Sequence, residues 1–499
     1  MNHQIKKRRK RKIERTKSGK LKRIDFFMLG FGSMVGVGWA VSSNHWLAQS
    51  GGPWLAFIGF ILGTILLIPI GLSYGELMST FPVSGGVMAY TYAAFGTFVS
   101  FLSSWFVALA YLTILPWEAI YINRIISSLI PALNEGVILY EMAGVPIYLN
   151  SAILGIVFAF LLFFINFKGS KLAAKLQGIL SWIIIIIGAM VIVLSLFKGS
   201  ITNLFPVYEN VGVGKHTGIF SGIISMIVLV PFFMAGFDTI AQSVGEAREG
   251  IKFRKIAHIL VLSIVAAGAF YAMIIISTAS VSPWRDYSLA SSPAMAPLLE
   301  NAYGGLFGKA LNTLVMFGTL AGLFTTWNGM FMAAARLLQS MGNAGLLPKV
   351  FSKEHPKYKT PVTASIFCLF AAAIGPFIGM NFIDPLTNLG SVAFVIGWLL
   401  TCLSALVLRK KAKCLVRRYS VPGGKYTLIL ATIISSLIVL LTFIPGQPAF
   451  MGTTGLILFS MWLVIGMIFY YYTNYGEKGI SEEQRSMNML GTKSNKFCK

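Results

Sequence analysis

Four acidic residues lie within or beside long hydrophobic stretches of this chain: Glu76, Glu118, Asp238 and Asp384. A charge at the depth of a lipid bilayer is costly, so a carboxyl group there is a candidate for carrying a proton or binding a cation. Glu118 follows Pro116 inside an apolar segment, where a buried carboxyl group could hold a proton or pair with a cationic substrate. Each of the four could instead be an interfacial charge at the end of a helix.

A glycine-rich sequence, GFGSMVGVGWA at 30–40, is the first candidate for holding a ligand. Spaced glycines can surround a phosphate where a strand turns into a helix, but no strand precedes this stretch. Close packing of membrane helices needs only two glycines four positions apart, which accounts for Gly32 and Gly36 but not for Gly38. The remaining interpretation is a membrane helix that is interrupted to bind a ligand.

A second interruption is predicted in PFFMAGFDT at 231–239. Pro231 removes a backbone donor and clashes with the preceding helical turn, and Gly236 lowers helix propensity further. Asp238 follows two residues later. A broken helix frees N–H groups that can bind a carboxylate and C=O groups that can bind an ammonium group or a cation. The two breaks together therefore suit a zwitterion.

The composition places these breaks in a membrane protein. Hydrophobic residues make up 56% of the 499 positions and charged residues only 12%, about half of the usual share in soluble domains. Twelve stretches are predicted to be membrane spans, at 25–50, 52–79, 98–123, 147–165, 172–197, 218–243, 256–280, 304–338, 361–380, 386–409, 425–444 and 450–474. The breaks fall in the first and sixth spans, the first members of two successive groups of five. Corresponding broken helices in two halves indicate a transporter binding site at the middle of the membrane.

The positive charges support this number of spans. With the N-terminus in the cytoplasm, 36 of the 41 lysines and arginines fall in cytoplasmic segments, and only Arg124, Lys198, Lys215, Arg285 and Lys309 fall outside. Such a bias is typical of cytoplasmic loops. We therefore predict a multi-pass protein of a bacterial plasma membrane with both termini in the cytoplasm.

The N-terminal tail, 1–24, begins with a strongly basic run, KKRRKRK at 6–12. It is predicted to lie against anionic lipid headgroups rather than to bind nucleic acid. The five histidines and four cysteines are scattered, without the spacing of a metal site or a catalytic set. We expect that the protein binds no cofactor and is not an enzyme. A channel is disfavoured because the polar residues cluster at two breaks and do not follow a continuous pore.

Four sequence segments make the chain specifically similar to a known family. GSMVGVG, YGELMSTFPVSGGVMAYTYAAFG (74–96) and MAGFDTIAQSVGEAREG (234–250), with GNAGLLPKVFSKEHPKYKTP (342–361), resemble the amino acid–polyamine–organocation permeases over about 25–475. The resemblance implies an all-α, leucine-transporter-like fold with twelve membrane helices. It divides the chain into a first five-helix repeat (25–200), an inverted second repeat (201–409), two last helices (410–475) and a cytoplasmic C-terminal tail (476–499).

The resemblance also implies the roles of individual residues. The backbone amides of Gly36, Val37 and Gly38 would bind the substrate carboxylate, and the carbonyls of Met34, Phe232 and Ala235 would take its ammonium group. Phe232 would serve as an aromatic lid, while Trp327 and Met330 would line the side-chain pocket. Glu76, at the cytoplasmic end of the second span, is interpreted as a gate or as a structural partner of basic residues in the inner loops.

The sequence departs from the family pattern at the residues that couple transport to an ion. Many proton-coupled members have a lysine in the fifth helix, where this chain has Ile184, and a glutamate before Tyr111, where it has Ala110. Coupling could then use Na⁺, held by the hydroxyl groups of Thr325 and Thr326 with carbonyl groups of the first helix. Threonine in a membrane helix also commonly bonds its own backbone.

Proton coupling through Glu118 or Asp238 and exchange without a coupling ion also remain open. The predicted function is a secondary permease that moves amino acids by alternating access. An amine or polyamine exchanger and a nutrient sensor that does not transport are the alternatives. The large apolar pocket favours a neutral side chain, whereas Glu118 favours a cationic one.

Overall fold

The computed structural model describes residues 21–473 and 480–491, apart from positions 84, 143, 214–215, 249, 291–292 and 448–449. Most of the predicted basic tail, Lys215 and half of the predicted C-terminal tail lie outside the described residues. The predicted tail boundary at residue 24 falls inside folded structure, because Leu21 is buried and pairs with Ala247 in a short parallel bridge.

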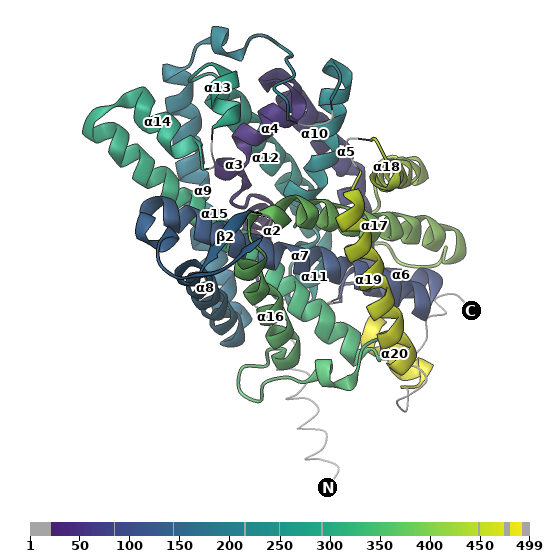
Figure 1. Cartoon of the computed structure of the whole chain (residues 1–499). Helices are drawn as coiled ribbons and strands as arrows, with labels where there is room; N and C mark the ends of the chain where they lie inside the picture. Colours follow the sequence, from purple (N-terminus) through teal and green to yellow (C-terminus); the bar gives the residue numbers. More distant parts are fainter. Residues whose placement is uncertain are drawn as a thin grey trace.

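Most of the chain is helical (Figure 1). The helices of the first half are α2 (Arg23–Met34), α3 (Gly38–Val41), α4 (Ser43–Ser50), α5 (Pro53–Thr80), α6 (Val87–Phe95), α7 (Thr97–Leu129), α8 (Leu149–Phe167) and α9 (Ser170–Lys198). Those that follow are α10 (Ile219–Phe233), α11 (Thr239–Ser243), α12 (Phe253–Ala279), α13 (Trp284–Leu289), α14 (Met295–Tyr303), α15 (Gly305–Asn343), α16 (Val362–Ile378), α17 (Ile383–Lys411), α18 (Lys425–Phe443), α19 (Gly452–Tyr471) and α20 (Glu482–Leu490). Short 3₁₀ turns are η1 (Pro131–Asn134), η2 (Ile201–Leu204), η3 (Val244–Glu246), η4 (Lys349–Ser352) and η5 (Met380–Phe382).

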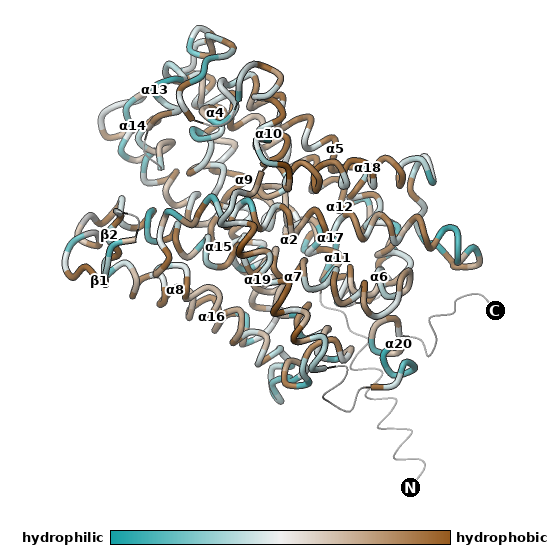
Figure 2. Tube along the Cα trace, turned by 45° about the vertical axis from the view of Figure 1, so that its right-hand side comes forward, coloured by the Kyte–Doolittle hydropathy of each residue, from teal (hydrophilic) through white to brown (hydrophobic). Residues whose placement is uncertain are grey.

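Each predicted span coincides with one of these helices or with a broken series of them. Among the described residues, ten helical segments are long and apolar enough to cross a membrane, and α10 and α16 are shorter apolar helices. Figure 2 shows hydrophobic stretches along the helices and hydrophilic residues gathered near α13 and α20. The chain is therefore a polytopic membrane protein, as the composition predicted.

The expectation of an all-helical chain is corrected by one β-hairpin. Strands β1 (Ile138–Met142) and β2 (Val145–Tyr148) pair antiparallel with an irregularity between Ile138 and Tyr140. Valine, isoleucine and tyrosine favour an extended backbone, in a segment that reads from sequence only as a loop with acidic residues. The hairpin is attached to the α16–α17 connection, because Asn381 donates a hydrogen bond to the Met142 carbonyl at 2.9 Å.

The longest helix, α15, defines two ends of the molecule. Its 39 residues extend over about 58 Å at 1.5 Å per residue. Helix α14 packs near its start, and α20 contacts the chain just after it, through Arg485 and the Ala344 carbonyl. We call these ends the α14 face and the α20 face; α14 and α20 lie far apart in Figure 1.

Ion pairs and a terminal helix join the elements at the α20 face. The buried Glu76 carboxylate receives two hydrogen bonds from Arg409, at 2.8 and 2.5 Å, and one from the Val421 amide at 2.8 Å. Arg336 pairs with Glu246 at 2.8 Å between α15 and η3. Sequence reasoning missed α20 as a folded element, since its charged residues resemble an ordinary polar tail.

Candidate substrate site

Helix α2 ends at Met34, and the chain resumes helical geometry only at Gly38. The Val35 amide still bonds the Phe31 carbonyl at 2.7 Å, and the Gly36 amide bonds the Met34 carbonyl at 3.1 Å. The amides of Val37 and Gly38 have no backbone acceptor among the described residues. This break is the one predicted from the spacing of the glycines.

Small residues allow α15 to approach this break closely. A Cβ atom at Gly36 would lie 2.1 Å from Thr326 Oγ1, and one at Gly322 would lie 2.7 Å from the Gly36 carbonyl oxygen. Neither distance is possible between real atoms, so both positions require glycine. The sequence at 322–326 therefore contributes contact with the break as well as hydroxyl groups.

The second break separates α10, which ends at Phe233, from α11, which begins at Thr239. Gly236 has a φ of +123°, and a Cβ atom there would lie 2.7 Å from the backbone carbon of Ser33. A side chain would thus be both strained and in collision with the first break. The two interruptions, two hundred residues apart in sequence, touch each other.

A small cavity lies between the breaks, with a volume of about 20 Å³. Its walls are Ser33, Met34, Gly36, Val37, Gly38, Ile114, Trp117, Glu118, Phe232, Phe233, Ala235, Tyr271 and Thr326. A space of this size holds about one water molecule. The cavity is therefore too small for an amino acid in this conformation.

Eight predicted site residues line this cavity: Met34, Gly36, Val37, Gly38, Glu118, Phe232, Ala235 and Thr326. The sequence reasoning did not name Ile114 or Tyr271. Tyr271 donates a hydrogen bond to the Met34 carbonyl at 2.8 Å, so that carbonyl already has a partner in this conformation. A lone tyrosine in an otherwise apolar segment was the available signal, since a buried phenol needs a hydrogen-bond partner.

Glu118 is the one acidic residue that lines this cavity. Its side chain is 1% exposed, and Oε2 has no hydrogen-bond partner. Among the residues that the structure describes, no lysine, arginine or histidine lines the cavity. A carboxylate buried without a partner is strongly disfavoured, so the site favours either a proton on Glu118 or a cationic group beside it.

The two threonines predicted as ion ligands differ in their surroundings. Thr325 donates its hydroxyl hydrogen to the Gly322 carbonyl at 2.7 Å, within its own helix. Thr326 lines the cavity, and its Oγ1 has no partner. Of the pair, only Thr326 is placed to contact a ligand between the breaks in this conformation.

Asp238 lies outside the cavity, in a separate buried position. Tyr111 donates a hydrogen bond to its Oδ2 at 2.6 Å, while Oδ1 has no partner. Asp238 is fully buried. The tyrosine that the family pattern marks in the third span is therefore a partner of this carboxyl group, connecting α7 to the second break.

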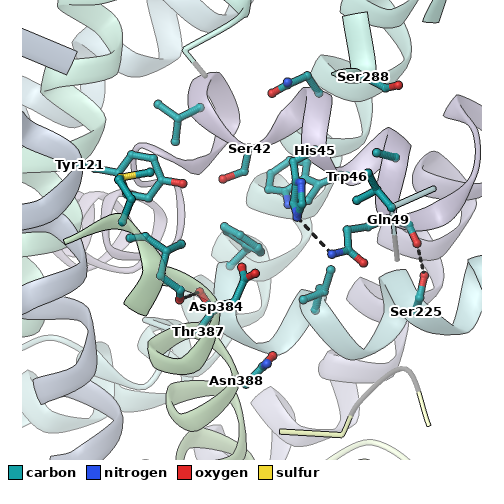
Figure 3. Close-up of a pocket in the computed structure, with 18 of the residues that line it drawn as sticks. Ser42, His45, Trp46, Gln49, Tyr121, Ser225, Ser288, Asp384, Thr387 and Asn388 are labelled. Carbon is teal, nitrogen blue, oxygen red and sulfur yellow. Dashed lines mark hydrogen bonds between the residues drawn. The ribbon is translucent and has the colours of Figure 1, made fainter. Parts of the chain in front are cut away.

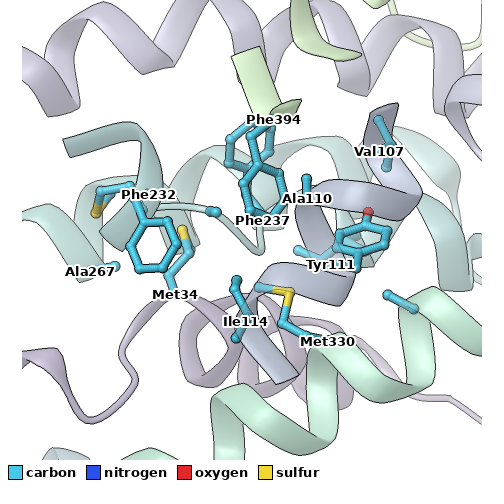
Figure 4. Packing of buried hydrophobic residues seen from close by; sticks show 14 of the residues in the cluster. Met34, Val107, Ala110, Tyr111, Ile114, Phe232, Phe237, Ala267, Met330 and Phe394 are labelled. Atoms are coloured by element: carbon cyan, nitrogen blue, oxygen red, sulfur yellow. The ribbon is translucent and has the colours of Figure 1, made fainter. Parts of the chain in front are cut away.

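Trp327 and Met330 are also buried but do not line the cavity. Met330 packs among Ile114, Tyr111 and other apolar side chains of the core (Figure 4). Trp327 stacks on Phe324 within α15, with ring centroids 6.4 Å apart. In this conformation Met330 lies behind Ile114, a residue of the cavity wall (Figure 4).

Ile184, at the position where the family resemblance implies a lysine in proton-coupled members, is fully buried in α9. Helix α9 is joined to its neighbours by neutral groups one and two turns away. Ser181 donates to the Met28 carbonyl at 3.1 Å, and Asn328 donates to Gln177 Oε1 at 2.8 Å. These bonds connect α9 to α2 and α15 without a positive charge.

A second, larger cavity of about 780 Å³ lies on the α14-face side of the first. We call it the vestibule; it is lined by parts of α4, α7, α10, α13 and α17, and Figure 3 shows several of its side chains. Trp117 and Phe233 line both cavities. Phe233 packs edge-on against Trp46 at 4.8 Å, and Trp117 lies 5.7 Å from Phe232 between ring centroids. These aromatic rings form the partition between the vestibule and the closed cavity.

Comparison with known proteins agrees with this architecture. The family model described as amino acid permease matches residues 21–470. The chain is 24% identical over 471 residues to the branched-chain amino acid permease BcaP of Bacillus subtilis (strain 168), covering 92% of this chain and 93% of the relative.

Two other relatives from the same organism have different substrates in their names. The methylthioribose transporter is 25% identical over 457 residues, covering 90% of this chain and 92% of the relative. The aspartate-proton symporter is 25% identical over 413 residues, covering 80% of this chain and 74% of the relative. The chain belongs to the amino acid permease family of transporters and is not an enzyme.

Proposed function

We propose that this protein is a proton-coupled permease of the plasma membrane that takes up amino acids by alternating access. The observation that carries the proposal is the Glu118 carboxyl group, buried at the cavity between two broken helices, with one oxygen unpartnered. Such a group can gain a proton on one side of the membrane and lose it on the other.

The proposed architecture is the leucine-transporter-like one: inverted five-helix repeats at 25–200 and 201–409, then two helices within 410–475, with both termini in the cytoplasm. It is supported by the contact between the two breaks, one in each repeat, at Gly236 and Ser33. Broken helices in corresponding positions of two repeats are where such transporters bind substrate.

The proposed binding mode follows from the groups that the breaks leave available. The amides of Val37 and Gly38, assisted by that of Gly36, would hold the substrate carboxylate. The carbonyl group of Ala235 would hold the ammonium group. The Phe232 carbonyl, which accepts a bond from the Ala235 amide at 3.3 Å, and the Met34 carbonyl, which accepts one from Tyr271, would join if those donors release them. The aromatic and aliphatic walls favour a neutral side chain. Trp327 and Met330 would reach the substrate only if α15 or its neighbours move.

Sodium coupling has less support than proton coupling. A hard cation needs several oxygen ligands, and the Thr325 hydroxyl is bonded within its own helix. Asp238 is a second proton candidate, but Tyr111 already bonds one of its oxygens. We propose that Asp238 helps to hold α11 in place through Tyr111, and that Glu118 is the group that carries the proton.

One alternative function is favoured by the same carboxyl group. If Glu118 stays ionised, it would bind the positive charge of a cationic amino acid or a polyamine, and the protein would be an exchanger of amines. The two functions differ in what removal of the charge abolishes. If Glu118 carries the proton, removing its charge abolishes the response of uptake to pH. If Glu118 binds an amine, removing its charge abolishes the uptake of cationic substrates selectively.

The test is uptake of a mixed set of radiolabelled amino acids and amines into proteoliposomes that contain the full chain. Three conditions are compared: an inward proton gradient of two pH units, an inward sodium gradient, and neither. A two-unit gradient can drive up to about 100-fold accumulation of a substrate that moves with one proton. The variants are Glu118→Gln and, as a matched control that also loses one carboxylate, Glu141→Gln in the exposed hairpin.

We expect proton-driven uptake of neutral amino acids by the wild-type protein and by Glu141→Gln. Glu118→Gln should lose the response to the gradient and keep counterflow of the same amino acids. Continued proton stimulation in Glu118→Gln would refute the role of Glu118, and sodium-driven uptake would refute proton coupling. Selective loss of cationic substrates would establish the amine exchanger. No transport of any amine in any condition would refute the permease and favour a sensor.

A further inference from the structure

The vestibule contains hydrogen-bond acceptors that have no partner. Asp384 lines it from α17 as an exposed carboxylate without a hydrogen bond or ion pair to the described residues. Asn44 lines it from α4 and is 3% exposed. The Asn44 amide nitrogen donates to the Ala290 carbonyl at 2.8 Å, which leaves its buried Oδ1 without a donor. Asn44 Oδ1 is buried away from the open space, so Asp384 is the acceptor that a positively charged donor in the vestibule would meet.

The other charged groups around the vestibule do not offset its preference for a positively charged ligand. Among the described residues that line it, Asp384 is the one carboxylate, and no lysine or arginine is present. His45 lines it too, and its Nε2 lies 3.1 Å from the Gln49 amide nitrogen, both on α4 (Figure 3). Arg124 is exposed nearby on α7 but does not line the space. At neutral pH, with His45 uncharged, the vestibule lining has a net negative charge.

Aromatic rings complete the surroundings of these acceptors. Trp46, Trp117 and Tyr121 line the same space, and Trp117 lies 4.3 Å from Tyr121 between ring centroids. Tryptophan and tyrosine faces attract ammonium groups. A carboxylate and aromatic rings together form the chemistry that recognises an organic ammonium ion.

We propose that the vestibule is a recruitment site for organic ammonium groups, in which Asp384 holds the amine of an incoming molecule beside the aromatic rings of the lining. The site is separated from the closed cavity by Trp117 and Phe233, which line both spaces. A bound amine would wait there until the aromatic partition opens. The role of this recruitment site in uptake rests on the proposed transport function, whereas ammonium binding in the vestibule does not.

The test measures the charge of the vestibule directly, on detergent-solubilised full-length protein at pH 7.5. Asn388→Cys places a thiol in the vestibule lining one helical turn after Asp384. The thiol is labelled with a cationic, an anionic and a neutral methanethiosulfonate reagent. Wild-type protein labelled in parallel gives the background from native cysteines. The cationic-to-anionic rate ratio is used because changes in ionisation of the thiol affect both rates equally and cancel.

Adding Asp384→Asn should lower the cationic-to-anionic ratio about tenfold, because a unit charge 5–6 Å away changes each rate by about threefold in opposite directions. Asp384→Glu keeps the charge and should keep the ratio. Asp286→Asn is the matched control: it removes an exposed carboxylate of α13 that does not line the vestibule. It should change the ratio less than twofold.

The ammonium assignment has its own measurement. Ethylammonium chloride at 50 mM should slow labelling of Asn388→Cys by the neutral reagent, compared with sodium chloride at the same ionic strength, and Asp384→Asn should abolish the effect. A ratio that Asp384→Asn leaves unchanged would overturn the proposal. Equal protection by sodium would overturn the ammonium specificity. If labelling behaves as expected but no amine is transported, the uptake role fails with the proposed function and ammonium binding stands.

Discussion

Replacing Glu76 by glutamine tests whether this residue is a gate or a structural anchor. Its carboxylate is 2% exposed and accepts hydrogen bonds from Arg409 and from the Val421 amide, and Arg417 Nε lies 3.6 Å away. Glutamine keeps the shape but replaces one acceptor oxygen by a donor that faces other donors. The change therefore leaves at least one donor of the connection between α17 and α18 unsatisfied.

The magnitude follows from the number and kind of bonds that are lost. Breaking one partner of a buried ion pair costs about 3–5 kcal/mol, and the partial exposure of Arg409, at 23%, lowers our expectation to about 2–4 kcal/mol. The free energy needed to open the 412–424 segment locally should fall by this amount. Hydrogen exchange at the Val421 amide should then be faster by about 30-fold to about 10³-fold.

The assay is hydrogen–deuterium exchange of the full chain in lipid nanodiscs, read from peptides that contain Val421. Ser79→Ala is a neutral control on the same helix: it removes a hydrogen bond from the Tyr419 amide at 3.1 Å, for which we expect about 0.5–1.5 kcal/mol. The double variant Glu76→Gln with Arg409→Gln should be destabilised by at least about 1 kcal/mol less than the sum of the two single changes. Unchanged exchange in Glu76→Gln, with an altered transport rate, would refute the anchor and support the gate.

Two further changes test the helix break and the terminal helix. Gly36→Ala should reduce substrate binding by about fivefold to about 150-fold, because its Cβ would lie 2.1 Å from Thr326 Oγ1 and such overpacking costs about 1–3 kcal/mol. Gly178→Ala, whose added Cβ meets no atom within 4 Å, should bind normally in the same equilibrium-binding assay, and equal binding by both variants would contradict the model of the break. Arg485→Ala should speed hydrogen exchange across α20, since it removes bonds to the Ala344 carbonyl and Glu482 that contribute about 1.5–3 kcal/mol. Unaltered exchange there would show that other contacts hold α20, such as the bonds from Tyr92 to Glu482 and from Asn488 to the Asn343 carbonyl.

The sequence predicted the features of this protein that depend on local chemistry. Apolar stretches of sufficient length identified the membrane helices, because burying the backbone in hydrocarbon requires helices and long apolar surfaces. The glycines near Gly36 and the Pro231–Gly236 segment located both breaks, because glycine and proline destabilise helices wherever they occur. The motifs around these breaks were sufficient to indicate the family.

Other elements escaped the sequence because their stability comes from distant contacts. Helix α20 is held by residues that follow α15, and the hairpin is held by the α16–α17 connection. Tyr271 entered the site through its bond to the Met34 carbonyl, more than two hundred residues away. No local pattern specifies such partners.

Which candidate side chains face the cavity was decided by the rotation and packing of the helices. Successive residues of an α-helix differ by about 100° in direction, so Thr325 and Thr326 face different surroundings although they are adjacent. Glu118 lines the cavity, whereas Asp238 lies against Tyr111. The sequence by itself determined where the helices run and break and which groups could bind a proton or a cation. Only the tertiary structure decided which of those groups share one cavity, because that depends on how each helix is turned against its neighbours.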